Sequence, residues 1–150
     1  MDAFLAFAAR RFALSPAEAR ALTGGLLWLM QLHAGEDFAQ LYALDPDVAR
    51  LVDGAPAALA PARRALPFFP GQGRVCGTQA SVLRLFSRHG FSLARAGRFA
   101  RGMLAFLATE AGSAPVHAIV ARTPVLLLLL SAEASPGPRP RPSRPLSAVA

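Results

Sequence analysis

The chain of 150 residues contains no lysine, and all 16 of its basic residues are arginine. Together with the abundance of alanine, this usage is typical of a GC-rich coding bias, so we attach no mechanism to it. It does bear on one motif. The segment from Gly71 to Thr78 resembles a phosphate-binding loop, but three residues separate Gly73 from Gly77 and no lysine follows, which excludes the Walker pattern. An ordinary turn is expected there.

Cysteine is almost as scarce. Cys76 is the single one, which excludes an intrachain disulfide and a metal cage built from cysteine alone. A Cys–His nucleophile would need Cys76 beside His33, His89 or His117, and no local spacing supports such a pair. The fold must therefore rest on packing, and we predict no catalytic residue.

Long apolar runs are missing too. The most hydrophobic stretch, from Val125 to Leu130, falls short of the roughly 20 residues that span a bilayer. At the N-terminus a short apolar run precedes Arg10 and Arg11, whereas a secretory signal carries its positive charge first. A cytoplasmic location is expected.

Acidic residues are few after residue 53. Residues 1–53 hold four arginines and seven acids, whereas residues 54–150 hold twelve arginines and two acids. A basic half raises the chance of an anionic partner, either nucleic acid or a membrane surface, and the alternative is a solvated, solubilising face.

Apolar residues recur at helical spacing, with no strand-like alternation. We predict an all-α fold, a compact bundle of about six helices. Ser15 precedes Pro16 and lies three residues before Glu18, which is the spacing of a capping box with proline at the first helical position. Gly35 is placed to end the long helix that follows.

The helix start after Ser15 has an echo later in the chain. At a sequence offset of 77, Ser15 matches Ser92, Gly25 matches Gly102 and Leu27 matches Leu104. The echo predicts a two-fold internal repeat, and a glycine inside each long helix predicts a close approach. We expect Gly25 and Gly102 to mark where the two long helices meet.

Composition divides the chain into a helical domain at residues 1–130 and a tail at residues 131–150. Within the domain, residues 55–77 are rich in proline and glycine and are predicted to be a connector. The tail interleaves proline with arginine and is predicted to be disordered, because its composition cannot bury a core.

Most acidic residues of the first half coincide with predicted helix starts, which indicates capping more than metal binding. They lack the alternating spacing of a calcium loop, and the histidines lack the paired spacing of ligands, so no metal or cofactor is expected. The acids in question are Glu36, Asp37, Asp45, Asp47 and Asp53.

Arginines form two stripes at helical spacing in the second half. They are the candidate contacts for an anion or partner: Arg84, Arg88, Arg95, Arg98 and Arg101. A nucleic-acid groove would also favour stacking aromatics, whereas the nearby phenylalanines lie at core spacing.

Several short motifs carry a family resemblance: the stretch from Leu14 to Ala19, Gly24-Gly25-Leu26-Leu27, Gly90-Phe91-Ser92 and the stretch from Leu104 to Leu107. With them the chain resembles the VcgC/VcgE-like family of uncharacterised bacterial proteins and, more loosely, the YidB-like helical group. The resemblance covers residues 3–128 and implies an all-helical bacterial domain. It implies no activity, cofactor or catalytic residue.

The expected function is a non-enzymatic interaction or structural domain with a protein partner or a second copy of itself. The alternative is a basic binding protein that contacts nucleic acid or an anionic membrane through its arginine-rich second half.

Overall fold

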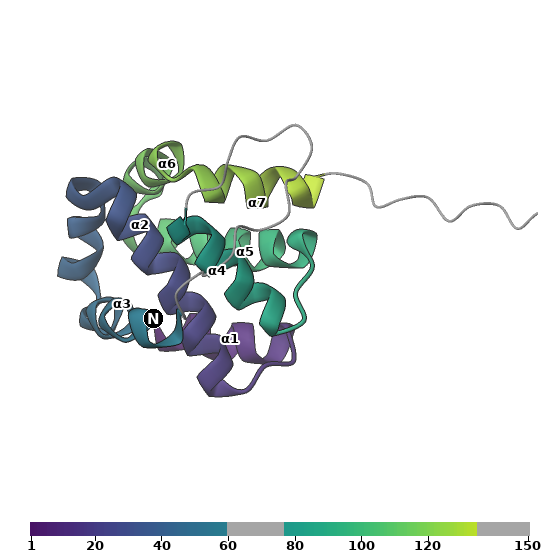
Figure 1. Ribbon diagram of the computed structural model, residues 1–150. Helices are drawn as coiled ribbons and strands as arrows, with labels where there is room; N and C mark the ends of the chain where they lie inside the picture. Colours follow the sequence, from purple (N-terminus) through teal and green to yellow (C-terminus); the bar gives the residue numbers. More distant parts are fainter. Residues whose placement is uncertain (60–76, 135–150) are drawn as a thin grey trace, which may run out of the picture.

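The computed structural model describes residues 1–59 and 77–134, which form seven α-helices and no strand (Figure 1). The all-α prediction is confirmed, with one helix more than the expected six. The helices are α1 (Asp2–Arg11), α2 (Pro16–Leu44), α3 (Pro46–Ala58), α4 (Gly77–Arg88), α5 (Leu93–Ala111), α6 (Ser113–Arg122) and α7 (Pro124–Ala134).

The longest helix, α2, begins with the predicted capping box. The Ser15 hydroxyl accepts the Glu18 N–H at 3.2 Å, and Glu18 Oε2 accepts the Ser15 N–H at 2.7 Å. The helix was expected to end at Gly35. Instead it bends at Ala34, whose φ of −131° and ψ of 37° are not helical, and it continues to Leu44. The expected end is therefore a kink.

Two predicted boundaries shift. The connector was expected from residue 55, but α3 continues to Ala58 with Pro56 inside its last turn, and Gly77 already belongs to α4. The tail was expected from residue 131, but α7 continues to Ala134. The rest of both predicted segments lies outside the described residues.

The turns before α2 and α5 have the same construction. Helix α1 ends with Ala13 at a φ of +49°, and the Leu14 N–H donates to the Ala9 carbonyl at 2.9 Å. Helix α4 ends with Gly90 at +71°, and the Phe91 N–H donates to the Phe86 carbonyl at 3.0 Å. Both are Schellman endings with a left-handed residue. Each leads at once into a serine cap, since Ser92 accepts the Arg95 N–H as Ser15 accepts the Glu18 N–H.

The correspondence extends further than the sequence echo. The kink at Ala34-Gly35 has its counterpart, at the same offset of 77, in Ala111-Gly112, where α5 ends and α6 begins. From there the offset is 78. Asp45-Pro46 corresponds to Thr123-Pro124, and each pair starts a helix with the same backbone hydrogen bond, from residue 48 to 45 and from 126 to 123. The fold thus contains two units of four helical segments each. The first unit consists of α1, the two parts of α2 on either side of the kink, and α3, and the second consists of α4, α5, α6 and α7.

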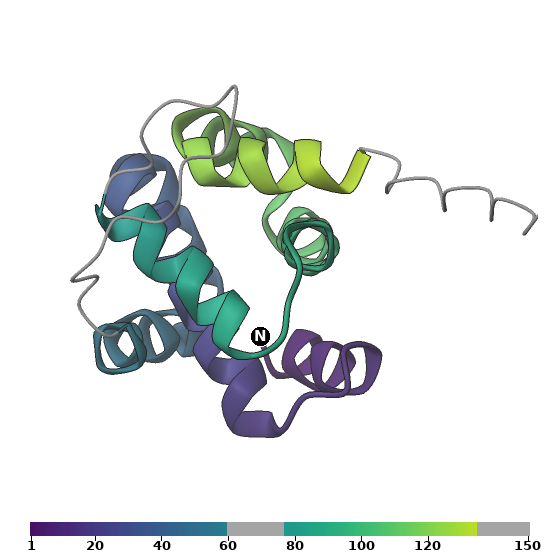
Figure 2. The same ribbon diagram turned by 45° about the vertical axis from the view of Figure 1, so that its right-hand side comes forward.

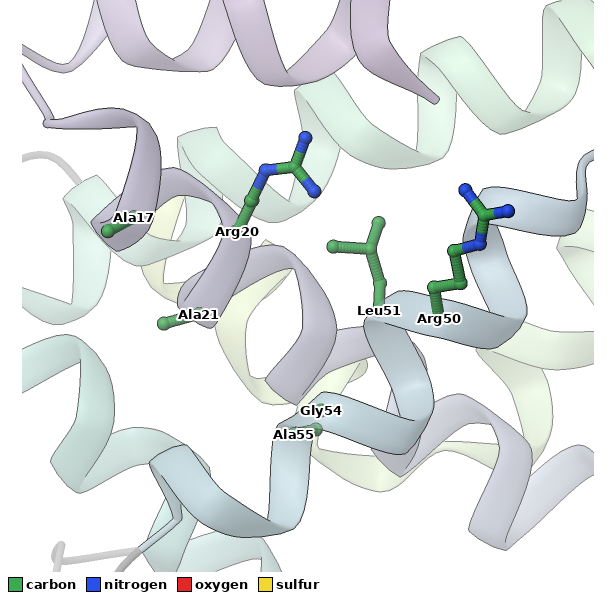
Figure 3. A pocket seen from close by; sticks show the side chains of 7 residues that line it. All are labelled: Ala17, Arg20, Ala21, Arg50, Leu51, Gly54 and Ala55. Atoms are coloured by element: carbon green, nitrogen blue, oxygen red, sulfur yellow. The ribbon is translucent and has the colours of Figure 1, made fainter.

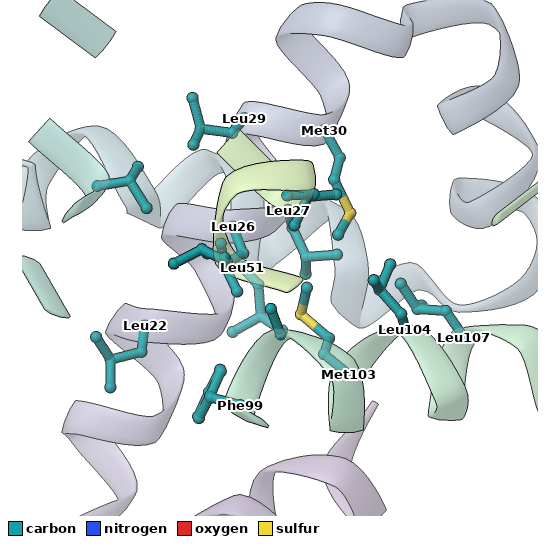
Figure 4. Close-up of a cluster of buried hydrophobic side chains, with 14 of the residues drawn as sticks. Leu22, Leu26, Leu27, Leu29, Met30, Leu51, Phe99, Met103, Leu104 and Leu107 are labelled. Carbon is teal, nitrogen blue, oxygen red and sulfur yellow. The ribbon is translucent and has the colours of Figure 1, made fainter. Parts of the chain in front are cut away.

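Equivalent positions of the two units supply the core (Figure 4). Leu22 and Phe99, which correspond at the offset of 77, are both fully buried, and so are Leu26 and Met103. At an offset of 78, Leu51 of α3 and Leu129 of α7 are buried as well. The repeat is therefore a repeat of packing as well as of helix ends.

The two units pack against each other reciprocally. A Cβ added at Gly25 of α2 would lie 3.1 Å from Leu85 Cδ2 of α4, and one added at Gly102 of α5 would lie 3.6 Å from Phe7 Cε1 of α1. Figure 2 shows α4 lying along α2. The prediction that these glycines mark the crossing of α2 and α5 is wrong. Each glycine faces the first helix of the other unit, as residues do across an interface between two copies.

Candidate functional site

Two side-chain contacts join the units at their turns. Arg95 Nη2 donates to the Phe12 carbonyl at 2.6 Å, and the Arg95 guanidinium carbon lies 4.4 Å from the centre of the Phe91 ring. His89 Nδ1 lies 3.1 Å from Glu18 Oε1. Among the five predicted contact residues, Arg95 thus has a structural role within the fold.

The other predicted arginines lie on two helices. Arg84 of α4 is half-buried, whereas Arg88 of the same helix and Arg98 and Arg101 of α5 are exposed. Arg88 and Arg101 interact with other groups of the chain. The exposed arginines that remain as candidate contacts therefore lie on two helices, Arg88 on α4 and Arg98 and Arg101 on α5.

Of the five predicted capping acids, Asp45 caps a helix, while Asp47 pairs with Arg50 and Asp37 with Arg122. Asp45 Oδ1 accepts the Asp47 N–H at 2.9 Å, and its other oxygen pairs with the amino group of Met1. Burial raises the pKa of Asp45, but these hydrogen bonds and the ammonium charge outweigh burial and leave the pKa below its ordinary value. Over residues 1–59 and 77–134, no three Asp, Glu, His or Cys side chains are placed to hold a metal.

The Cys–His hypothesis involves a residue that the structure does not describe, because Cys76 lies just before Gly77. The segment from Gly71 to Thr78 is also mostly outside the described part. His33 Nε2 is buried without a hydrogen-bond partner among the described residues, and His89 is engaged with Glu18.

A hollow of about 360 Å³ opens between α2 and α3 (Figure 3). Small or apolar residues form its floor: Ala17, Ala21, Leu51, Gly54 and Ala55. Arg20 and Arg50 rise from the two helices on the same side of the hollow, with Leu51 between them. Two guanidinium groups therefore flank an apolar floor.

Close packing of α2 on α3 places these residues. A Cβ added at Gly24 would lie 2.5 Å from the Leu51 carbonyl oxygen and 3.7 Å from Ala55 Cβ, so only glycine fits there. One turn earlier, Ala17 and Ala21 leave space open to solvent. Sequence reasoning missed this hollow because its residues come from two helices whose register the sequence does not show.

Both arginines of the hollow have acidic neighbours. Arg20 lies 3.8 Å from Asp2, and Arg50 lies 3.1 Å from Asp47. The arginine side chains are nonetheless 62% and 82% exposed, so these pairs are screened by water and hold the guanidinium groups only loosely. An anion entering the hollow could replace either carboxylate.

Within the described residues, no single helix is both long and apolar enough to cross a membrane. The segments Ser113–Arg122 and Pro124–Ala132 pass the test of length and composition as a pair, but they are bent by 98°. Much of α7 is packed in the core, with Val125, Leu126 and Leu129 buried and Leu127 49% exposed.

Comparison with known proteins found no match to any family model, any curated protein or any solved structure. The resemblance to the VcgC/VcgE-like family therefore stays a prediction.

Proposed function

We propose that this chain is a non-enzymatic interaction or structural domain that works by presenting helix surfaces to a protein partner or a second copy. The observation that supports this most is the use of its polar side chains: Ser15, Glu18, Asp45 and Ser92 cap helices, and Arg95 ties the units together. These polar side chains stabilise the helical fold, and this is the use expected of them in a structural domain.

Large apolar side chains remain at the surface of this scaffold. Phe7 of α1, Leu32 of α2 and Leu127 of α7 are 45%, 54% and 49% exposed. Burial of such a side chain against a partner would remove apolar surface from water, and the proposal places at least one of the three in the interface.

Light scattering during size-exclusion chromatography over a range of concentrations tests this proposal, combined with capture from bacterial lysate. We expect the mass to rise with concentration or a specific protein to be retained, and we expect Leu32→Gln and Leu127→Gln together to reduce either effect. Ala105→Gln on exposed α5 surface is the control. A constant monomer mass with no retained protein would contradict the proposal.

A second candidate is binding to an anionic membrane, and the contrast between α3 and α7 favours it. Arg50 of α3, 82% exposed, corresponds at the offset of 78 to the half-buried Leu128 of α7. Helix α7 thus carries leucine where its counterpart carries charge. Arg122 lies just before it, 57% exposed and paired with Asp37 at 3.2 Å. Leucine beside arginine suits the boundary of an anionic bilayer.

Sedimentation with vesicles tests this second candidate. At low salt we expect binding to vesicles containing phosphatidylserine, little binding to phosphatidylcholine vesicles, and a loss of binding in Leu127→Gln. Binding to duplex DNA with no binding to vesicles would favour nucleic acid instead. No adhesion to either would exclude the whole class of anionic surfaces.

A further inference from the structure

We propose that the hollow between α2 and α3 is a binding site for a small organic anion, one with a carboxylate, sulfonate or phosphate head and a short apolar body. The head would lie between Arg20 and Arg50, and the body would rest on the floor formed by Ala17, Ala21 and Leu51. This site does not depend on the interaction role proposed above.

Charge is the first argument. Residues 1–53 hold seven acids and four arginines, yet two of these four arginines flank the same hollow. A guanidinium presents several N–H donors in one plane, which suits a carboxylate or phosphate better than a single donor does. Each guanidinium lies beside one carboxylate, Asp2 or Asp47, and the anion would bind by taking the place of these exposed partners at the edge of the hollow.

Comparison of the two units supplies the second argument. The counterparts of Arg20 and Arg50 are Gly97 of α5 and Leu128 of α7, at offsets of 77 and 78. The second unit has the same succession of helix starts and ends without either arginine. The shared scaffold therefore does not require these side chains, which leaves a role at the surface of the first unit.

The shape of the hollow is the third argument. Its volume of about 360 Å³ is at the lower end of the range of ligand sites in proteins, roughly 300–1,000 Å³. An apolar floor with a few polar groups at its edge is the usual composition of such sites. A small amphiphilic anion matches both the size and the chemistry, whereas a bare inorganic ion would leave the floor uncovered.

Titration with octanoate, followed by amide chemical shifts in NMR spectra, tests the proposal, with octanol as the uncharged probe. We expect octanoate to shift the amides of Ala17, Ala21, Gly54 and Ala55, and octanol to shift them less. In Arg20→Gln/Arg50→Gln the dissociation constant should rise at least about tenfold. Arg84→Gln/Arg98→Gln removes the same charge elsewhere and should change it less than about twofold.

Two further variants separate ligand contact from an indirect role. Gly54→Leu adds a side chain where nothing lies within 4 Å of the Cβ position, so it should fill the hollow and weaken binding without loss of fold. Asp2→Asn frees Arg20 from its acidic neighbour and should not weaken binding.

Three results would overturn the proposal. The first is the absence of shifts in these amides up to the solubility limit of octanoate. The second is equal weakening by the two double arginine variants, which would indicate general charge attraction. The third is weakening by Asp2→Asn as large as that by Arg20→Gln/Arg50→Gln, which would show that the arginines act through their carboxylate partners and not on the anion.

Discussion

Arg95 Nη2 lies 2.6 Å from the carbonyl oxygen of Phe12, so the start of α5 is fastened to the end of α1. The equivalent positions, at the offset of 77 in opposite directions, are Glu18 and His89, and these two are also in contact, at 3.1 Å. The start of α2 is therefore fastened to the end of α4. An arginine–carbonyl contact and a glutamate–histidine contact thus occupy equivalent positions in the two units.

Arg95→Ala should destabilise the protein by about 1–2 kcal/mol, because it removes a hydrogen bond from a charged donor and the contact with the Phe91 ring. Arg98→Ala, an exposed arginine on the same helix, should change the unfolding free energy by less than about 0.5 kcal/mol. Urea denaturation measures both. Equal effects would show that the Phe12 contact does not stabilise the fold.

Glu18 connects stability to pH. The hydrogen bond from the Ser15 N–H, with help from the Ser15 hydroxyl and His89, lowers the pKa of Glu18 below its ordinary value of 4.5. Because the folded pKa is the lower one, ionised Glu18 contributes stability that is fully present above about pH 4.5 and is lost as the pH falls through the folded pKa.

Glu18→Gln tests this contribution, since glutamine can keep the capping box but carries no charge. The difference in unfolding free energy between the natural protein and Glu18→Gln should shrink as the pH falls below 4.5. The cap itself is tested by adding Ser15→Ala to the Glu18→Gln variant, which has no carboxylate at position 18. Loss of the Ser15 hydroxyl should then lower the free energy of unfolding by about 1 kcal/mol. A Glu18→Gln difference that does not vary with pH would contradict the assignment.

Exchanging alanine and glycine at the two Schellman endings should have opposite effects on stability. Ala13 and its counterpart Gly90 both have a left-handed backbone, with φ of +49° and +71°, a conformation that disfavours a side chain. Ala13→Gly should therefore stabilise the fold, and Gly90→Ala should destabilise it, each by about 1 kcal/mol. Thermal denaturation gives both signs. If both substitutions shift the melting temperature in the same direction, the two turns are not equivalent.

Gly24 and Gly54 form a matched pair on α2 and α3. A Cβ at Gly24 would meet the Leu51 carbonyl oxygen at 2.5 Å, so Gly24→Ala must push the helices apart and should cost about 1–3 kcal/mol. A Cβ at Gly54 meets nothing within 4 Å, so Gly54→Ala should stabilise by about 0.5–1 kcal/mol through helix propensity. A neutral Gly24→Ala would contradict the close packing of α2 on α3.

Local chemistry accounts for what the sequence predicts correctly. The predicted capping box at Ser15 depends on a few neighbouring residues. The serine cap at Ser92 and the glycines that end helices at Gly90 and Gly112 are equally local features. The echo at an offset of 77 follows from two of these caps. In the sequence it is visible only as far as α5, because the one-residue change in offset after Gly112 hides the match between α3 and α7.

Contacts between helices account for what the sequence does not predict. An interior glycine indicates close approach but not which helix approaches, so the sequence pairs Gly25 with Gly102 although they face α4 and α1. The spacing of Arg95 with Arg98 indicates a common stripe, yet a tertiary contact with Phe12 takes Arg95 out of it. The pairing of Arg20 with Arg50 depends on the register of α2 on α3.

Nuclear Overhauser effects from the two glycines provide the most direct measurement of the reciprocal packing. The account predicts cross-peaks between a Gly25 Hα and the Leu85 methyl groups, and between a Gly102 Hα and the ring protons of Phe7 or Phe4, because these atoms lie nearest to the Cβ positions. A direct cross-peak between Gly25 and Gly102, with none to Leu85 or Phe7, would contradict it.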